Sequence, residues 1–472
     1  MSPLILAVTA AAVGLALAAG PDAIAAEKQV PLTKAEIQLS FSSLVKKSAP
    51  AVVNIYARKV VRRRQSLPLF NHPFFRRFFG EEFGFGMPRK QVQNSLGSGV
   101  IVRHDGLIVT NKHVIEGAEK IIVVMADRRE FSAKIVVTDD RTDLAILQVD
   151  TGGEKLPVLA LRDSDDLEVG DLVLAIGNPF GVGQTVTSGI VSALARTRVT
   201  SSDLNFFIQT DAAINPGNSG GALVTMDGKL AGVNTAIFSK SGGSLGIGFA
   251  IPSNMVRAVI TGITQDGRLV RPWLGASGQG VSQDIASSLG MARPTGVLIN
   301  LVFKGAAADK AGLRTGDIVL AVNGHEVNDP KGLRFRIATL PVGDTVVLRV
   351  WRRNATQALK LLLSPPPENP PRELTVLAGR QPLAGATVAN MSPALADELG
   401  FDLFAKGIVV VDLERGSAAN RLGFRIGDLV RAVNGREVPT VADLKAFLRG
   451  TAERWRINIE RDGKSLNLVV KG

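Results

Sequence analysis

The 472-residue chain contains no cysteine. This absence excludes disulfide bonds, a cysteine nucleophile and thiolate metal sites, and it leaves the redox compartment open. Histidine is also scarce, with only His72, His104, His113 and His325. None of the four has metal-ligand spacing, and no pair of carboxylates suits calcium or magnesium. We therefore expect no metal and no other cofactor.

Charged residues make up only 21% of the chain, against 45% hydrophobic residues, so globular domains are expected rather than disorder. The length suggests about three domains. A formal net charge of +12 would suit an anionic partner. The basic residues are dispersed, however, and no phosphate-cradling or RNA-binding motif accompanies them. We expect a solvated basic surface and no nucleic-acid partner.

Long apolar runs are missing beyond the leader, so we expect no later membrane span. Residues 1–26 combine an apolar stretch at 4–19 with small residues at 23–26, which suit a signal peptidase. No Lys or Arg precedes the apolar stretch, so a retained anchor is the alternative. We expect an exported protein with a cleaved signal peptide.

The run N-P-G-N-S-G-G at 215–221 places Ser219 among glycines whose N–H groups can reach a bound oxygen. A serine hydroxyl needs a base and an orienting carboxylate to act as a nucleophile. His113 in T-N-K-H-V is the candidate base, and Asp143 in R-T-D-L-A-I-L is the candidate carboxylate. His, Asp, Ser is one of the chain orders known for this constellation. His104 precedes an Asp-Gly turn signal and is expected to be an exposed turn residue.

Five motifs occur in one order along the chain: T-N-K-H-V, T-D-L-A-I-L, G-N-P-F-G, Q-T-D-A-A-I-N-P-G-N-S-G-G and G-F-A-I-P. Together they resemble the Do-like (Deg/HtrA) family of periplasmic serine endoproteases. One departure is Lys112, where the family usually carries asparagine. Short apolar runs between Gly and Asp turns from 96 to 260 themselves indicate an all-β protein.

The resemblance implies a mostly β chain: a chymotrypsin-like double β-barrel protease domain at 27–262, with the triad between the barrels, followed by two PDZ domains at 272–365 and 374–472. A short helix ending before Pro50 should precede the first strand. An insertion at 57–95 is rich in Arg and Phe. Contact with a membrane or with nucleic acid is one interpretation of it; the resemblance favours regulatory packing against a neighbouring active site.

An internal repeat is visible without any family knowledge. Residues 296–337 align without gaps to 407–448, and both copies carry G-D-[IL]-V-x-A-V-N-G. The Pro-rich segment at 364–371 between them is expected to be a stiff spacer. The copies resemble PDZ domains, which add a peptide as a strand and hold its carboxylate in a backbone loop. The expected peptide-binding loop is Trp273, Leu274, Gly275 and Ala276; residues 383–386 match less well, so the second copy is either a second peptide site or a linking module.

The resemblance also assigns the remaining site residues. The oxyanion donors would be the N–H groups of Gly217 and Ser219, with Asn218 as a third candidate. The substrate pocket would involve Ile214, Thr235 and Ile237 and accept small aliphatic side chains; ordinary barrel core is the alternative for the isoleucines. The strand that carries Thr235 would offer its edge to the substrate backbone. Arg196 would belong to a regulatory sensor loop.

The function that follows is an ATP-independent serine endopeptidase that degrades unfolded envelope proteins in periplasmic quality control and assembles as a homotrimer or a larger cage. The rival hypothesis is a chaperone or PDZ scaffold that holds chains without cutting them. A complete triad favours the protease, because a scaffold needs none of its three residues.

Overall fold

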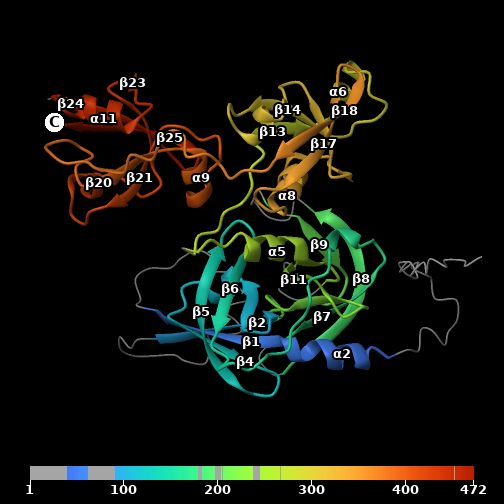
Figure 1. Cartoon of the computed structure of the whole chain (residues 1–472). Helices are drawn as coiled ribbons and strands as arrows, with labels where there is room; N and C mark the ends of the chain where they lie inside the picture. The colour runs from blue at the N-terminus through green and yellow to red at the C-terminus, as the bar shows by residue number, and fades with distance from the viewer. Residues whose placement is uncertain are drawn as a thin grey trace, which may run out of the picture. The chain divides into compact units, whose positions relative to one another are not determined.

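The computed structural model describes residues 40–61, 91–178, 183–196, 204, 206–237, 245–265, 267–450 and 452–471 (Figure 1). Strands predominate, which confirms the mostly β prediction. The expected leader at 1–26 and the middle of the expected insertion, 62–90, lie outside the described residues. In the ranges given above, no helix is long and apolar enough to cross a membrane.

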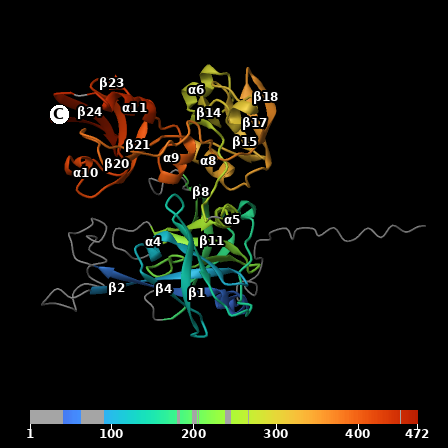
Figure 2. The same ribbon diagram turned by 60° about the vertical axis from the view of Figure 1, so that its left-hand side comes forward.

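Six antiparallel strands close the first barrel in the order β1-β2-β3-β6-β5-β4. Their bounds are Val52–Val61 (β1), Gln91–Arg103 (β2), Leu107–Asn111 (β3), Lys120–Val124 (β4), Glu130–Asp139 (β5) and Leu144–Val149 (β6). Figure 2 shows β1 beside β2 and β4, its two partners. The β1–β2 ladder extends to Val61 and Gln91, so both ends of the expected 57–95 insertion are strand rather than loop.

Six more strands close the second barrel in the order β10-β11-β12-β9-β8-β7. Their bounds are Leu172–Gly177 (β7), Thr185–Arg196 (β8), Phe207–Thr210 (β9), Ala222–Thr225 (β10), Leu230–Ile237 (β11) and Gly248–Pro252 (β12). The apolar run L-V-L-A-I-G forms β7 from end to end. Two closed barrels confirm the predicted architecture.

Short helices accompany the barrels: α2 Ser42–Ser48, η1 Ala49–Ala51, α4 Lys112–Ile115, η3 Ser164–Asp166 and α5 Ser253–Thr261. The helix α2 ends before Pro50 and β1 follows at Val52, as predicted. The helix α5 buries Met255, Val256 and Val259 along one face.

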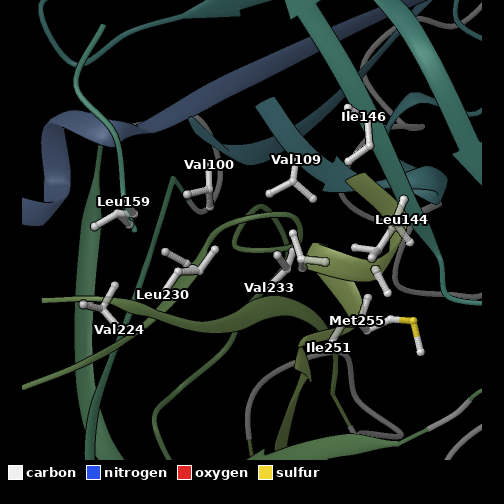
Figure 3. Packing of buried hydrophobic residues seen from close by; sticks show 14 of the residues in the cluster. Val100, Val109, Leu144, Ile146, Leu159, Val224, Leu230, Val233, Ile251 and Met255 are labelled. Atoms are coloured by element: carbon white, nitrogen blue, oxygen red, sulfur yellow. The ribbon is translucent and has the colours of Figure 1, made fainter. Parts of the chain in front are cut away.

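One hydrophobic cluster joins the two barrels (Figure 3). The first barrel contributes Val100, Val109, Leu144 and Ile146, and the second contributes Val224, Leu230, Val233 and Ile251. Each such side chain gains about 1.5–3 kcal/mol on burial. The apolar side chains that alternate along the strands therefore fill each barrel and also hold the two barrels together.

Two further sheets carry the internal repeat. In the first module the elements are β13 Ala276–Gly280, α6 Gln283–Ser288, β14 Val297–Val302, α7 Ala307–Lys310, β15 Ile318–Val322, β16 His325–Glu326, α8 Pro330–Ala338, β17 Thr345–Arg352 and β18 Ala355–Leu362. In the second they are β19 Thr375–Val376, β20 Ala386–Asn390, α9 Pro393–Leu399, β21 Ile408–Leu413, α10 Ala418–Arg421, β22 Leu429–Val433, β23 Arg436–Glu437, α11 Val441–Leu448, β24 Arg454–Arg461 and β25 Lys464–Lys471. The second sheet has one strand more, because β19 adds to β20.

A buried ion pair recurs at the same place in both modules. Arg352 Nε and Nη2 each donate to a carboxylate oxygen of Asp317 at 2.6 Å. Arg461 does the same to Asp428 at 2.6 and 2.7 Å. The aspartates are the D of the repeated G-D-[IL]-V motif and are almost fully buried. Bidentate pairing satisfies these buried charges, which explains why the motif carries an acid.

We predict that Asp428→Asn lowers the free energy of unfolding of the second module by about 3 kcal/mol, because the Arg461 guanidinium loses its countercharge. Trp455 is 3% exposed in that module and reports its unfolding by fluorescence. Urea titration would be followed in a Trp273→Phe, Trp351→Phe background, which leaves Trp455 as the only tryptophan. The matched control is Asp412→Asn on the exposed face of β21, which should leave the midpoint unchanged.

Candidate active site

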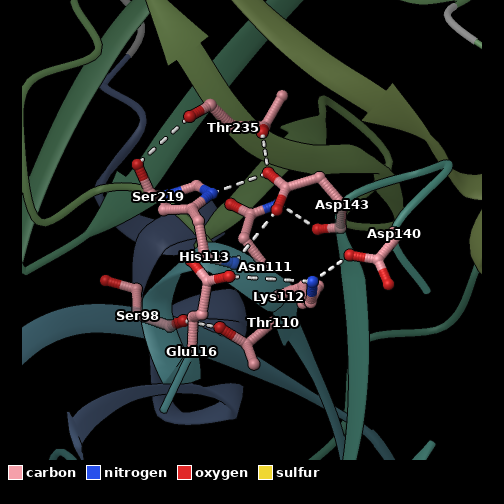
Figure 4. Close-up of polar contacts among 10 residues, drawn as sticks. All are labelled: Ser98, Thr110, Asn111, Lys112, His113, Glu116, Asp140, Asp143, Ser219 and Thr235. Carbon is pink, nitrogen blue, oxygen red and sulfur yellow. Dashed lines mark hydrogen bonds and ion pairs between the residues drawn. The ribbon is translucent and has the colours of Figure 1, made fainter. Parts of the chain in front are cut away.

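His113 and Asp143 meet at two points, as Figure 4 shows. The Nδ1 atom of His113 lies 2.6 Å from Asp143 Oδ2. The backbone N–H of His113 donates to Asp143 Oδ1 at 3.0 Å. Two contacts to one carboxylate fix the ring orientation and leave Nε2 for a reactant.

Asp143 lies in a tight turn just before β6 rather than inside a strand, and its side chain is 35% exposed. Its φ of 58° is left-handed, a conformation that Asp tolerates better than most residues. The carbonyl of Asp143 accepts from Asn111 Nδ2 at 3.0 Å and from the Lys112 N–H at 2.9 Å. The turn is thereby tied to the start of α4, which carries His113.

Lys112 contributes its backbone to this arrangement while its side chain points elsewhere. The Lys112 ammonium pairs with Asp140 and lies 3.8 Å from Glu116. Burial of the Lys112 side chain disfavours its charged form. The hydrogen bond to Asp140 and the negative charges of Asp140, Glu116 and Asp143 outweigh this effect and raise the pKa of Lys112. The N–H that bonds Asp143 is available from any residue except proline, so the lysine keeps this geometry.

Ser219 lies on the loop before β10, and the first barrel holds this loop. The Ser98 N–H donates to the Ser219 carbonyl at 2.9 Å, and Ser98 Oγ donates to the Gly217 carbonyl at 2.7 Å. Gly220 has φ +82°, and a Cβ there would lie 2.1 Å from the Ser98 carbonyl oxygen. Only glycine fits this close approach.

The Ser219 hydroxyl is turned toward β11. Its Oγ donates to the Thr235 carbonyl at 3.2 Å. In the described part of the chain it makes no hydrogen bond to His113. Hydrogen bonds between catalytic groups are often loose before substrate binds, and a rotation about χ1 redirects the hydroxyl.

The candidate oxyanion donors differ in their hydrogen bonding. The Asn218 N–H already donates to the Asn215 carbonyl at 2.9 Å. The N–H groups of Gly217 and Ser219 donate to no acceptor among the residues described. This difference favours Gly217 and Ser219 over Asn218 as oxyanion donors.

The expected pocket residues lie on separate elements. Ile214 is 1% exposed and belongs to the interior cluster of the second barrel, where the geometry favours the core role. The side chains of Ile237 and Arg196, at the ends of β11 and β8, lie outside the described side chains. Thr235 on β11 is brought next to both Asp143 and Ser219.

The peptide loop expected in the first module precedes β13. Trp273 donates its N–H to the Ser364 carbonyl at 2.9 Å, and the carbonyls of Leu274 and Gly275 accept from Ala308 and Phe303. Gly275 has φ +75°. Ala276 begins β13, which pairs with β14.

Comparison with known proteins agrees with this geometry. Residues 97–233 match the trypsin-like peptidase domain, and residues 243–363 and 409–461 each match a PDZ domain. The chain is 36% identical to the periplasmic pH-dependent serine endoprotease DegQ of Escherichia coli over 99% of both chains. It is 40% identical to a probable periplasmic DegP-like serine endoprotease of a Marinomonas species, over 87% of this chain and 88% of the relative.

The chain belongs to the Do-like (Deg/HtrA) family of periplasmic serine endoproteases. Among solved structures, it resembles the HtrA-type protease AlgW with a decapeptide: the TM-score is 0.51, the identity is 43%, and the match covers 70% of this chain and 99% of that one. As a Do-like protease, the protein is a periplasmic serine endopeptidase with PDZ domains, and it acts on proteins.

Sequence reasoning missed two contributions to the Do-like site. Thr235 was expected to line the pocket, yet its Oγ1 donates to Asp143 Oδ2 at 2.9 Å. No sequence pattern singles out Ser98, yet its hydroxyl holds the Ser219 loop. A hydroxyl in a strand carries no local signal of either role, because both partners come from distant segments.

We predict that Thr235→Val lowers kcat/KM about tenfold or more, because a hydrogen bond to a charged carboxylate contributes about 1.5–3 kcal/mol. Thr235→Ser keeps the hydroxyl and should stay near the wild-type value. Both rates would be measured on an unfolded model protein. Equal activity of the valine and serine variants would show that the Asp143 contact does not position the triad.

Proposed function

We propose that His113, Asp143 and Ser219 form the catalytic triad of this endoprotease. The observation that carries the proposal is the two-point contact between His113 and Asp143 beside the Ser98-anchored loop of Ser219. His113 Nε2 takes the Ser219 proton as Oγ attacks the peptide carbonyl, and it returns the proton to the leaving amine. Asp143 stabilises the imidazolium in both steps.

The N–H groups of Gly217 and Ser219 serve as oxyanion donors in this proposal. Their freedom from other acceptors among the described residues supports this role. Donors fixed in advance stabilise the tetrahedral oxyanion without reorganisation, and one such donor is typically worth about a hundredfold in rate or more. Before attack, the Ser219 hydroxyl must leave the Thr235 carbonyl.

The substrate is an extended segment of an unfolded protein. The ladder between β10 and β11 reaches Val233, and the backbone bonds to residues 220 and 221 end at Asn234. Among the described residues, no strand pairs with the stretch from Thr235 on that side, so this edge can accept a substrate strand. Pairing along a backbone edge selects for extended chain rather than for sequence. Unfolded envelope proteins fit this requirement. The family resemblance implies small aliphatic side chains before the cut, although Ile214 itself lies in the barrel core.

The quaternary structure in this proposal is a homotrimer or a larger cage, as the family resemblance implies, with the insertion, Arg196 and PDZ peptide binding regulating the site. The boundaries remain 27–262 for the protease and 272–365 and 374–472 for the PDZ domains. A non-cleaving chaperone is the alternative function, and the paired His113 and Asp143 argue against it as the sole role, because holding a chain requires neither.

We predict that Ser219→Ala abolishes cleavage of an unfolded model protein while its binding persists, because only the nucleophile is lost. Asp143→Asn should lower kcat by about 10⁴-fold, since the wrong imidazole tautomer then faces Ser219. Cleavage would be followed by gel and binding by fluorescence anisotropy, with particle mass measured in parallel. Turnover by the Ser219→Ala variant at the wild-type rate would refute the assignment of the nucleophile.

A further inference from the structure

The loops that precede β13 and β20 are built alike. In the first module, the carbonyls of Leu274 and Gly275 accept from Ala308 and Phe303 at 2.9 and 2.7 Å. In the second, the carbonyls of Ala384 and Gly385 accept from Ala419 and Glu414 at 3.1 and 2.9 Å. Both glycines are left-handed, with φ of +75° and +82°. The two loops are therefore equivalent positions of the repeat.

The backbone N–H groups of the two loops differ in their hydrogen bonding. In the first module, the N–H groups of Leu274 and Gly275 donate to no acceptor among the described residues. In the second module every loop N–H is already engaged: Leu383 donates to Gln381 Oε1 at 2.6 Å, Ala384 to the Gln381 carbonyl at 3.1 Å, Gly385 to the Leu377 carbonyl at 2.7 Å, and Ala386 to the Leu383 carbonyl at 3.0 Å. A carboxylate arriving at this second loop finds no free donor.

The strand edge beside the second loop is occupied as well. In the described residues, β13 pairs only with β14, so its other edge is open. The matching edge of β20 is covered by β19, in which Thr375 pairs with Val388 and Val376 pairs with Thr387. The contact extends in both directions, because Leu377 N–H donates to the Ala386 carbonyl at 2.8 Å and Asn390 N–H donates to the Arg372 carbonyl at 2.7 Å.

The burial of Leu377 is a further feature that this segment shares with a bound peptide. Its side chain is 5% exposed and belongs to the core cluster that includes Val441 and Leu444 of α11. The neighbours Leu374 and Val376 are 65% and 67% exposed. The segment thus buries its last apolar side chain and leaves the preceding ones in solvent, as a strand added at a PDZ groove does.

We propose that residues 371–377 act as a built-in ligand of the second PDZ domain, with Leu377 in the place of a ligand's last residue, so that peptides bind only to the first PDZ domain. Because this strand is part of the same chain, its effective concentration at the groove far exceeds that of a free peptide. The inference deepens the peptide recognition in the proposed function by limiting it to one site per chain.

The test counts binding sites on the full chain carrying Ser219→Ala, which cannot cleave the probe. The probe is a fluorescent peptide of the sequence Arg-Glu-Leu-Thr-Val-Leu, identical to residues 372–377. Leu377→Asp should expel the built-in strand and raise the number of bound peptides by one per chain. Val376→Asp is the matched control, and it should leave the number unchanged because Val376 is exposed.

In the opened domain, Gln381 still occupies the Leu383 and Ala384 donors, so the new site should bind the amidated peptide as well as the free acid. Trp455 fluorescence, measured in a Trp273→Phe, Trp351→Phe copy of the Leu377→Asp variant, shows whether the second domain is folded. No gain of a site in a folded variant would overturn the proposal. A parent protein that binds no peptide would refute recognition by the first domain, while a gain of one site in Leu377→Asp would still support the built-in ligand.

An engineered disulfide between β19 and β20 provides a second test if the Leu377→Asp variant fails to fold. The chain has no cysteine, so Val376→Cys with Thr387→Cys adds a single pair across the β19–β20 ladder. Oxidation should form the bond without reducing the number of peptides bound. A pair that does not close, or a closed pair that binds one peptide fewer than its reduced form, would overturn the proposal.

Discussion

The geometry of the proposed active site depends on the hydrogen bonds by which the first barrel holds a loop of the second. Ser98 bonds the carbonyls of both Gly217 and Ser219, and its hydroxyl also accepts from the Asn178 N–H. The serine is fully buried, so these bonds are shielded from water. The shared core fixes the barrels to each other, and this anchor adds a defined position for the Ser219 loop relative to His113 and Asp143.

Thr235 connects the two halves of the proposed triad through two different groups. Its hydroxyl donates to Asp143, while its backbone carbonyl accepts the Ser219 hydroxyl. In the proposed mechanism the first contact orients the Asp143 carboxylate, and the second holds the Ser219 hydroxyl away from His113. In the proposed function a substrate strand on β11 lies beside the same residue, and the proposal therefore couples substrate entry to release of the Ser219 hydroxyl from the Thr235 carbonyl.

The two PDZ domains share one scaffold but differ in whether the loop N–H groups and the neighbouring strand edge are already hydrogen-bonded. The Asp–Arg pairs Asp317–Arg352 and Asp428–Arg461 are the same, and the carbonyl anchors of the loops match. What differs is the chain that precedes each loop. In the second domain it turns back along β20 and satisfies the backbone donors and the edge that the first domain leaves open.

Much of this was readable from the sequence. Alternating apolar runs such as β7, the order of His113, Asp143 and Ser219, and the repeated G-D-[IL]-V motif are local patterns, because strand periodicity and turn chemistry act over a few residues. Only the tertiary structure decided that Thr235 Oγ1 bonds Asp143, that the Asn218 N–H is already bonded, and that residues 372–377 cover the edge of β20. Each of these depends on strand register and barrel closure, which bring together groups that no short-range pattern relates.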